Sequence, residues 1–283
     1  MKREKFGSRI GFILVSAGCA IGIGNVWKFP YLAGEMGGAA FILIYLLFLL
    51  IMGISVLVCE FAIGRASRYS IAEAFETLEP EGTKWHWTKW IGILGSYLLM
   101  MFYTTVAGWM LYYCFRNIRG DFAGAGTKEV EAGFSQMLGN APVMGLWTFI
   151  LIAVGFGICW FGIQNGIEKV SKVMMSVLFL IMIVLAVRSV FLEGAGEGVR
   201  FYLIPDFQKM QEIGIGNVIF GAMSQAFFTL SVGMGGMAIF GSYIDKKRSL
   251  MGESVTIILL DTLVAVLAGI IMFSACFTYG LEV

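Results

Sequence analysis

The chain has 283 residues, of which 58% are hydrophobic and 14% are charged, and its formal net charge is +1. Because soluble domains carry about 25% charged residues, this composition excludes an ordinary soluble domain, and the balanced charge gives no indication of a nucleic-acid partner. Several uncharged runs reach the roughly 20 residues that cross a bilayer as a helix. The sequence therefore predicts an all-α polytopic membrane protein.

Seven apolar spans follow in chain order within one predicted domain, 1–283. They cover about residues 8–35, 38–63, 89–116, 142–164, 168–191, 214–244 and 251–280. With a cytoplasmic N-terminus, most Lys and Arg residues lie on the inner side, as the positive-inside rule requires. The sequence thus predicts a multi-pass protein of the cell inner (plasma) membrane, with solvated outer connections at 117–141 and 192–213.

The first span contains residues that interrupt a membrane helix. The stretch "GCAIGIGNVWKFP", residues 18–30, holds three glycines followed by Asn25, Lys28 and Pro30. Glycine and proline are poor helix formers, and backbone leaves a helix inside a bilayer only where protein or a water-filled cavity surrounds it. Three more glycines interrupt the span 214–244, in "FFTLSVGMGGMAIFGSY". Two such spans at corresponding positions of two halves indicate a transporter binding site.

Close helix packing through small residues is the alternative explanation for these glycines. Packing does not require polar side chains at membrane depth, however, and this chain places Asn25, Thr229 and Asp261 there. Ionisable residues within a membrane are costly and mark functional sites by default. Asp261 is too deep in its span for its side chain to reach the membrane–water interface. Glu60 lies near the inner end of its helix, so a side chain that reaches this interface explains its position as well as a functional role does. No nucleotide-binding, metalloprotease or nucleophile motif is present, which indicates that the protein is not an enzyme.

Three stretches resemble one family, the neurotransmitter:sodium symporters. "RIGFILVSAGCAIGIGNVWKFPYLAGEMGGAAF" resembles the family's first helix and turn, and "CEFAIGR" and "FFTLSVGMGG" resemble its second and sixth helices. The short outer loop, which lacks glycosylation sites, is similar to the prokaryotic branch. The resemblance implies an inverted-repeat transporter fold with broken first and sixth helices. Because the family has about twelve helices, we expect seven of them here and a partial chain.

The resemblance also implies roles for individual residues. Those implied to bind the substrate, an amino acid held by its carboxylate, are Ala20, Gly22, Ile23, Gly24, Leu99, Tyr103, Phe228, Thr229, Ser231 and Met234. Those implied to bind Na⁺, with two ions expected, are Gly18, Ala20, Ile21, Asn25, Thr229 and Asp261. The second sodium site is expected to be incomplete, because the family's eighth helix completes it. Those implied to support the second break or the outer and inner gates are Glu60, Lys28, Arg3 and Tyr243.

The implied function is sodium-coupled symport of an amino acid with an apolar side chain, aliphatic or aromatic, by alternating access. Because Asp261 places a negative charge at membrane depth, we expect transport to be independent of chloride. An ion channel and a fragment that does not transport remain as alternatives. The expected partners are the amino-acid substrate and the lipid bilayer, and the oligomeric state stays open. Several residues depart from the family pattern. Lys28 replaces the usual arginine, Cys19 and Met234 are local substitutions, and Ser176 stands where the fifth helix often has proline.

Overall fold

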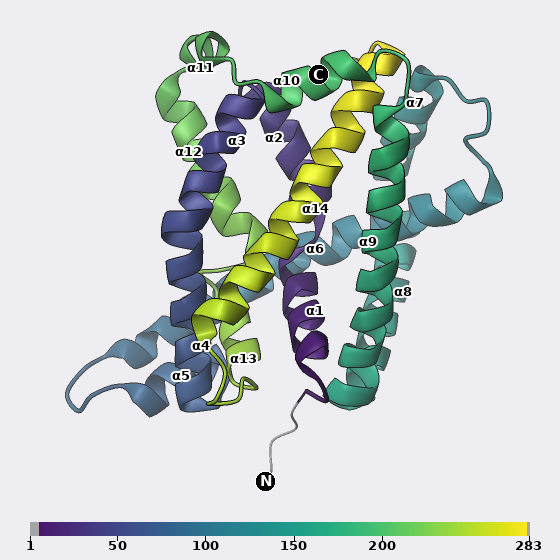
Figure 1. Ribbon diagram of the computed structural model, residues 1–283. Coiled ribbons are helices and arrows are strands. Elements are labelled where there is room, and N and C mark those ends of the chain that lie inside the picture. Colours follow the sequence, from purple (N-terminus) through teal and green to yellow (C-terminus); the bar gives the residue numbers. More distant parts are fainter. Residues whose placement is uncertain (1–5, 282–283) are drawn as a thin grey trace.

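The computed structural model describes residues 6–281, and within that range the architecture is helical (Figure 1). The helices and π-helical turns at membrane depth are α1 (Arg9–Ala20), η1 (Gly24–Lys28), α2 (Phe29–Glu35), α3 (Ala39–Phe48), η2 (Leu49–Gly53), α4 (Ile54–Ser67), α6 (Thr88–Arg119), α8 (Ala141–Trp160), η4 (Ile163–Glu168), α9 (Lys169–Val190), α12 (Ile215–Thr229), α13 (Gly236–Gly241) and α14 (Leu250–Tyr279). The short connecting helices are α5 (Ile71–Leu78), η3 (Trp85–Trp87), α7 (Thr127–Leu138), α10 (Ala195–Leu203) and α11 (Phe207–Ile213). In Figure 1, α1 begins at the lower end of the bundle and α14 ends at the upper end.

Five helical segments of the described chain are long and apolar enough to cross a membrane, and six if α1 and the helix that follows its bend are taken as one span. The remaining predicted span, 214–244, is divided into α12 and α13, which flank residues 230–235. Each of these two helices is shorter than the roughly 20 residues that a span requires. Ser176 lies within α9, which continues without a break through that position.

The first break begins at Ile21, whose backbone is extended (φ −72°, ψ 112°). The helix that resumes beyond it is bent by 53° relative to α1. The side-chain oxygen of Asn25 accepts a hydrogen bond from the Gly22 amide (3.1 Å), which replaces a helical partner that the break removes. Pro30 lies directly after the π-helical turn η1, within the helix that runs on from Gly24 to Glu35. Asn25 therefore lies at the break and also accepts a hydrogen bond from an amide that the break leaves without a helical partner.

The outer connections contain short helices. Segment 117–141 contains α7, and segment 192–213 contains α10 and α11. α10 buries Tyr202, whose ring stacks on that of Phe273 in α14 with centroids 5.3 Å apart. A short helix needs only one apolar face to pack against a neighbour, so glycines and charged residues can occupy its other faces.

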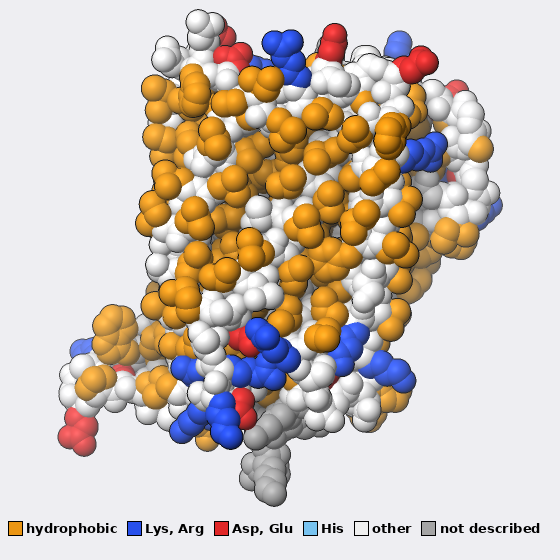
Figure 2. All heavy atoms as spheres, viewed as in Figure 1, with side chains coloured by type: hydrophobic (Ala, Val, Ile, Leu, Met, Phe, Trp, Pro, Cys, Tyr) orange, Lys and Arg blue, Asp and Glu red, His pale blue; other side chains and the backbone are white. Residues whose placement is uncertain are grey.

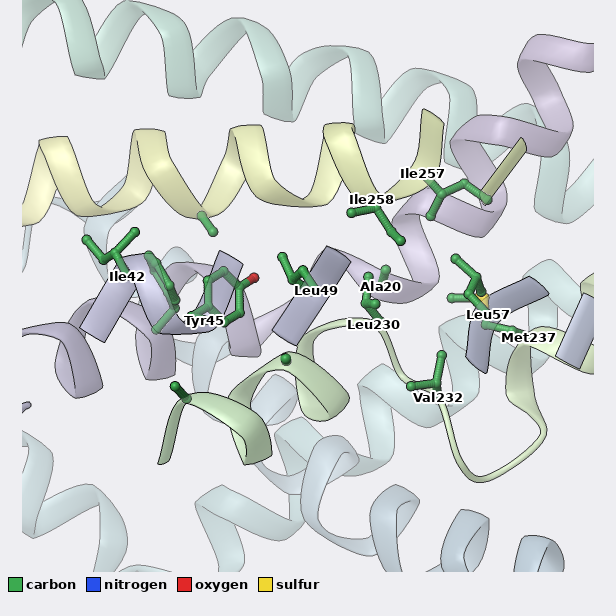
Figure 3. Close-up of a cluster of buried hydrophobic side chains, with 14 of the residues drawn as sticks. Ala20, Ile42, Tyr45, Leu49, Leu57, Leu230, Val232, Met237, Ile257 and Ile258 are labelled. Carbon is green, nitrogen blue, oxygen red and sulfur yellow. The ribbon is translucent and has the colours of Figure 1, made fainter. Parts of the chain in front are cut away.

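The main buried cluster lies where α3, η2, α12 and α14 meet around the breaks. Figure 3 shows Tyr45 and Leu49 facing the helix that carries Ile258, with Leu230 of the second break nearby. In contrast, α8 has no buried residue. Figure 2 shows hydrophobic side chains over the middle of the molecule, whereas Lys and Arg gather toward the two ends, above all at the end where α1 begins. This distribution is typical of a protein that spans a bilayer.

The contact between α4 and α13 positions the second half of the broken helix. A Cβ added to Gly64 would overlap the Ala238 carbonyl, and one added to Gly241 would lie 2.7 Å from the Phe61 backbone. Two glycines that face backbone across one contact let the helices approach closely, as small residues do in membranes. The contact fixes α13 against α4, which is the helix that carries Glu60.

We expect Gly64→Ala to lower the free energy of unfolding by about 1–3 kcal/mol, as overpacking of a dense interior does. The measurement is the Tm of the purified protein in detergent. Gly157→Ala on α8 is the matched control, because nothing lies within 4 Å of the Cβ that it adds. A Gly64→Ala variant that melts at the temperature of the Gly157→Ala variant would contradict the close contact.

Candidate functional site

A buried carboxylate joins both broken helices to α14. Asp261 is 0% exposed, and Asn25 and Thr229 beside it are 0% and 1% exposed. Asn25 Nδ2 donates to Asp261 Oδ1 (2.9 Å) and to the Asp261 carbonyl (3.1 Å). Thr229 Oγ1 donates to Asp261 Oδ2 (3.1 Å). Asn25 follows the first break and Thr229 ends α12 before the second break, so we call these three residues the Asp261 junction.

Two further hydrogen bonds connect the first break with α12 and the second break. Ser231 Oγ donates to the Cys19 carbonyl (3.0 Å) in the last turn of α1. Gln225 Nε2 donates to the Gly24 carbonyl (2.8 Å). The Cys19 carbonyl lies in the last turn of α1, where carbonyls lack intrahelical partners, and a side chain of the second break supplies its donor. The Gly24 carbonyl also accepts from the Phe29 amide of its own helix. The oxygen of the Gln225 side-chain amide, Oε1, is buried and accepts no hydrogen bond from residues 6–281.

The second break is supported by an acidic side chain from α4. Ser231, Gly233 and Gly235 have positive φ angles of 51°, 93° and 77°. The Gly233 amide donates to Glu60 Oε1 (2.5 Å), and Glu60 is only 7% exposed. The Gly233 amide has no helical partner, and its hydrogen bond to a carboxylate offsets the cost of breaking a helix at membrane depth. This geometry is the one that the resemblance implies for Glu60.

A hollow of about 280 Å³ lies beside the second break. Its lining consists of Leu99, Tyr103, Ser224, Phe227, Phe228, Ser231, Val232 and Met234. We call it the inner hollow, and none of its lining residues is charged. The first break borders it as well, because a Cβ on Gly24 would lie 3.1 Å from the Phe228 ring and one on Gly22 would lie 3.9 Å from the Tyr103 ring. Sequence reasoning missed Ser224, which precedes Phe228 by one helical turn and could have been found from that spacing.

A second hollow, of about 250 Å³, shares Phe228 with the first. We call it the outer hollow, and its other lining residues are Ile23, Trp27, Lys28, Tyr31 and Phe102. Lys28 Nζ lies 4.0 Å from the centroid of the Phe228 ring, which is a cation–π contact. The Tyr103 ring centroid is 6.2 Å from that of Phe228. The Phe228 ring thus borders both hollows. Sequence reasoning missed Trp27 and Tyr31, although their i,i+4 spacing places them on one helix face.

The residues implied for a second sodium site lie on the side of α1 that faces α9. A Cβ on Gly18 would lie 3.2 Å from the Met175 sulfur. Ile21 is buried in a cluster with Met175 and Val264, apart from the main core that contains Ala20. The structure therefore does not bring Gly18 and Ile21 into the Asp261 junction.

Of the two residues implied for the inner gate, Tyr243 lies near the start of α1. It packs edge-to-face against Phe6, with ring centroids 5.6 Å apart. Arg3 lies outside the described residues. Lys28, implied for the outer gate, lines the outer hollow as described above.

The donor atoms at the Asp261 junction determine which ion it suits. Carboxylate, amide and hydroxyl oxygens are hard donors, which favour alkali and alkaline-earth cations over transition metals. The junction has one carboxylate, which fits the single charge of Na⁺. Across residues 6–281 no group of three or more His, Cys, Asp and Glu side chains could hold a metal ion.

Comparisons with known proteins agree on one family. The sequence model of the "Sodium:neurotransmitter symporter family" matches residues 3–132 and 130–279. The uncharacterized sodium-dependent transporter YhdH of Bacillus subtilis is 38% identical over 282 residues, which are 99% of this chain and 61% of that protein. The sodium- and chloride-dependent taurine transporter of Homo sapiens is 27% identical over 96% of this chain and 50% of its own length.

A solved structure has the same fold. The crystal structure of MhsT in complex with L-phenylalanine superposes with a TM-score of 0.90 at 38% identity, and the match covers 99% of this chain and 63% of that one. The chain therefore spans 61% of the length of the Bacillus relative and 63% of the length of the solved structure.

The positive φ of Ser231 yields a test of strain at the second break. We expect Ser231→Ala to be less stable than Ser231→Gly by about 1 kcal/mol, because only glycine adopts the left-handed region without steric cost. Both variants lose the bond to Cys19, so their difference in unfolding free energy isolates the backbone. Ser224 in α12 is the matched control, and there the alanine variant should be the more stable by about 1 kcal/mol. The same order of stability at both positions would contradict the strained backbone.

Proposed function

Because the chain belongs to the sodium:neurotransmitter symporter family, we propose that this protein couples sodium movement to uptake of an amino acid with an apolar side chain. The observation that carries the proposal is the meeting of two broken helices on the buried carboxylate of Asp261. Sodium-dependent transport is the description that its relatives share. The protein is multi-pass, and we place it in the plasma membrane with its N-terminus in the cytoplasm, following the positive-inside rule.

Sodium is proposed to bind at the Asp261 junction. Asp261, Asn25 and Thr229 would supply side-chain oxygens, the Ala20 carbonyl a further one, and the substrate carboxylate the last. Each buried charge bears a desolvation cost of several kcal/mol, and a cation next to a carboxylate offsets that cost. A second ion is proposed near the Gly18 and Ile21 carbonyls, on the side of α1 that faces α9.

The substrate is proposed to occupy the inner hollow. The Tyr103 hydroxyl and the amides at both breaks, which include those of Gly22 and Gly24, would hold its carboxylate. Leu99, Phe228 and Met234 provide an apolar wall, and Met adapts readily to ligands of different shape. Because no charged residue lines the hollow, a charged substrate side chain would be buried without a partner. The bound L-phenylalanine of the similar MhsT structure supports an aromatic or aliphatic ligand.

Alternating access is proposed to open the inner hollow to one side of the membrane at a time. Phe228 borders both the inner and the outer hollow, with Lys28 against its ring, so movement of this ring would admit or retain the substrate. Arg3 and Tyr243 are proposed to close the opposite side. A sodium gradient would then supply the driving force, because sodium and the substrate carboxylate would stabilise the same arrangement of the two breaks.

We expect purified protein in proteoliposomes to take up L-leucine or L-phenylalanine only when an inward sodium gradient is present. L-Asparagine, which is close to leucine in size but polar, should compete at least about tenfold more weakly, because its amide would enter an apolar wall. The measurement is radiolabelled uptake with competition by unlabelled amino acids. Preference for lysine or glutamate would contradict the substrate class, and sodium flux without any amino acid would indicate a channel.

We expect uptake to be equal in chloride and in gluconate, because Asp261 provides the negative charge next to sodium. Asp261→Asn keeps the shape but removes the charge, so the sodium concentration for half-maximal uptake should rise at least about tenfold. Chloride should restore part of that loss, because it can supply the missing charge. Uptake by the unmodified protein that stops in gluconate, or a variant with unchanged sodium dependence, would show that the charge assignment is wrong.

A further inference from the structure

We propose that Ile71, the first residue of α5, supports Met234 at the edge of the inner hollow and thereby limits the size of the substrate side chain. The proposal rests on the proposed function, because it requires an amino acid to occupy this hollow. Met234 lines the hollow, whereas Ile71 does not. Ile71 is therefore a positioning residue, which acts on the substrate only through Met234.

The Ile71 side chain fills the space next to the second break. A Cβ added to Gly235, whose φ is 77°, would overlap the Ile71 side chain. A Cβ added to Gly92 of α6 would lie 3.2 Å from Ile71 Cγ2 and 3.2 Å from the Met234 carbonyl oxygen. The two glycines thus leave the room that Ile71 occupies, and its side chain lies next to the backbone that carries Met234.

The order of contacts along α6 places Ile71 and the hollow on opposite sides of Met234. Gly92 faces Ile71. About one helical turn farther on, a Cβ added to Gly95 would lie 3.4 Å from Met234 Cγ and 3.5 Å from the Met234 sulfur. Leu99, which lines the hollow, follows four residues later on the same helix face. The Met234 side chain therefore lies between Ile71 and the hollow.

The connection between α4 and α5 is attached to both ends of α13. Arg68 Nη1 donates to the Ser242 carbonyl (3.0 Å), which lies at the end of α13. Ile71 contacts Gly235, which precedes the first residue of α13. α5 also packs against α4 and α6. Ile71 is therefore held against the lower half of the broken helix, whereas Met234 belongs to the irregular segment, whose backbone has fewer constraints.

Truncation of Ile71 is expected to enlarge the space for the substrate side chain. Ile71→Ala removes three carbon atoms next to Met234, and a flexible methionine can move into the space that they leave. A single methylene group in an apolar pocket changes affinity by about tenfold or more. We expect the ratio of the Kd for L-tryptophan to the Kd for L-leucine to fall at least about fivefold in Ile71→Ala.

Equilibrium competition against radiolabelled L-leucine, with the purified protein in detergent at saturating sodium, measures both constants. Their ratio does not depend on the folded fraction of a variant, so lost stability alone leaves it unchanged. Ile71→Val removes only one carbon atom and should shift the ratio less than Ile71→Ala does. Leu78→Ala, in the last turn of α5, is the matched control and should leave the ratio unchanged, because the Leu78 side chain is exposed.

A second substitution tests whether Ile71 acts through Met234. Met234→Ala removes the side chain that Ile71 supports, so adding Ile71→Ala should leave the ratio at the value of Met234→Ala alone. A shift of equal size in both backgrounds would overturn the proposal, and so would an unchanged ratio in Ile71→Ala, while the proposed function would stand. If the unmodified protein bound no L-leucine in the presence of sodium, both the proposed function and this proposal would fail.

Discussion

The rest of the structure depends on a carboxylate that is fully removed from solvent in a membrane-spanning helix. A buried polar group in a bilayer must find its partners within the protein. Asp261 finds them in Asn25 and Thr229, which belong to two helices that are far apart in sequence. The same requirement applies to the backbone at both breaks, where Asn25 and Glu60 accept from amides that an intact helix would satisfy itself. The breaks and the buried acids therefore stabilise each other.

This arrangement couples neighbouring sites. Asn25 connects the first break to α14, Ser231 connects the second break to the end of α1, and Phe228 borders both hollows. A cation at the Asp261 junction would change the position of groups that also border the inner hollow. The tight contact of α4 with α13 keeps the lower half of the broken helix fixed, so rearrangement is expected at the breaks themselves rather than throughout the bundle.

The sequence was sufficient to locate the breaks and the junction because glycine, asparagine and acidic residues are exceptional inside a bilayer. Asn25, Thr229 and Asp261 could be singled out individually, and their resemblance to one family predicted that they meet. Other features depended on packing between distant segments. The helices in the outer connections and the contact of Lys28 with the Phe228 ring combine ordinary residue types. Neither composition nor helical periodicity shows which faces of separate helices meet.

Equilibrium binding of radioactive sodium to the purified protein tests whether the Asp261 junction binds sodium. Thr229→Val removes one donor oxygen at nearly constant volume, and Thr256→Val removes a hydroxyl from α14 that bonds only to its own helix in the described structure. We expect Thr229→Val to weaken sodium binding at least about tenfold, as the loss of a bond to a charged group does, and Thr256→Val to leave it unchanged. Equal sodium affinity in the two variants would contradict a sodium site at the Asp261 junction.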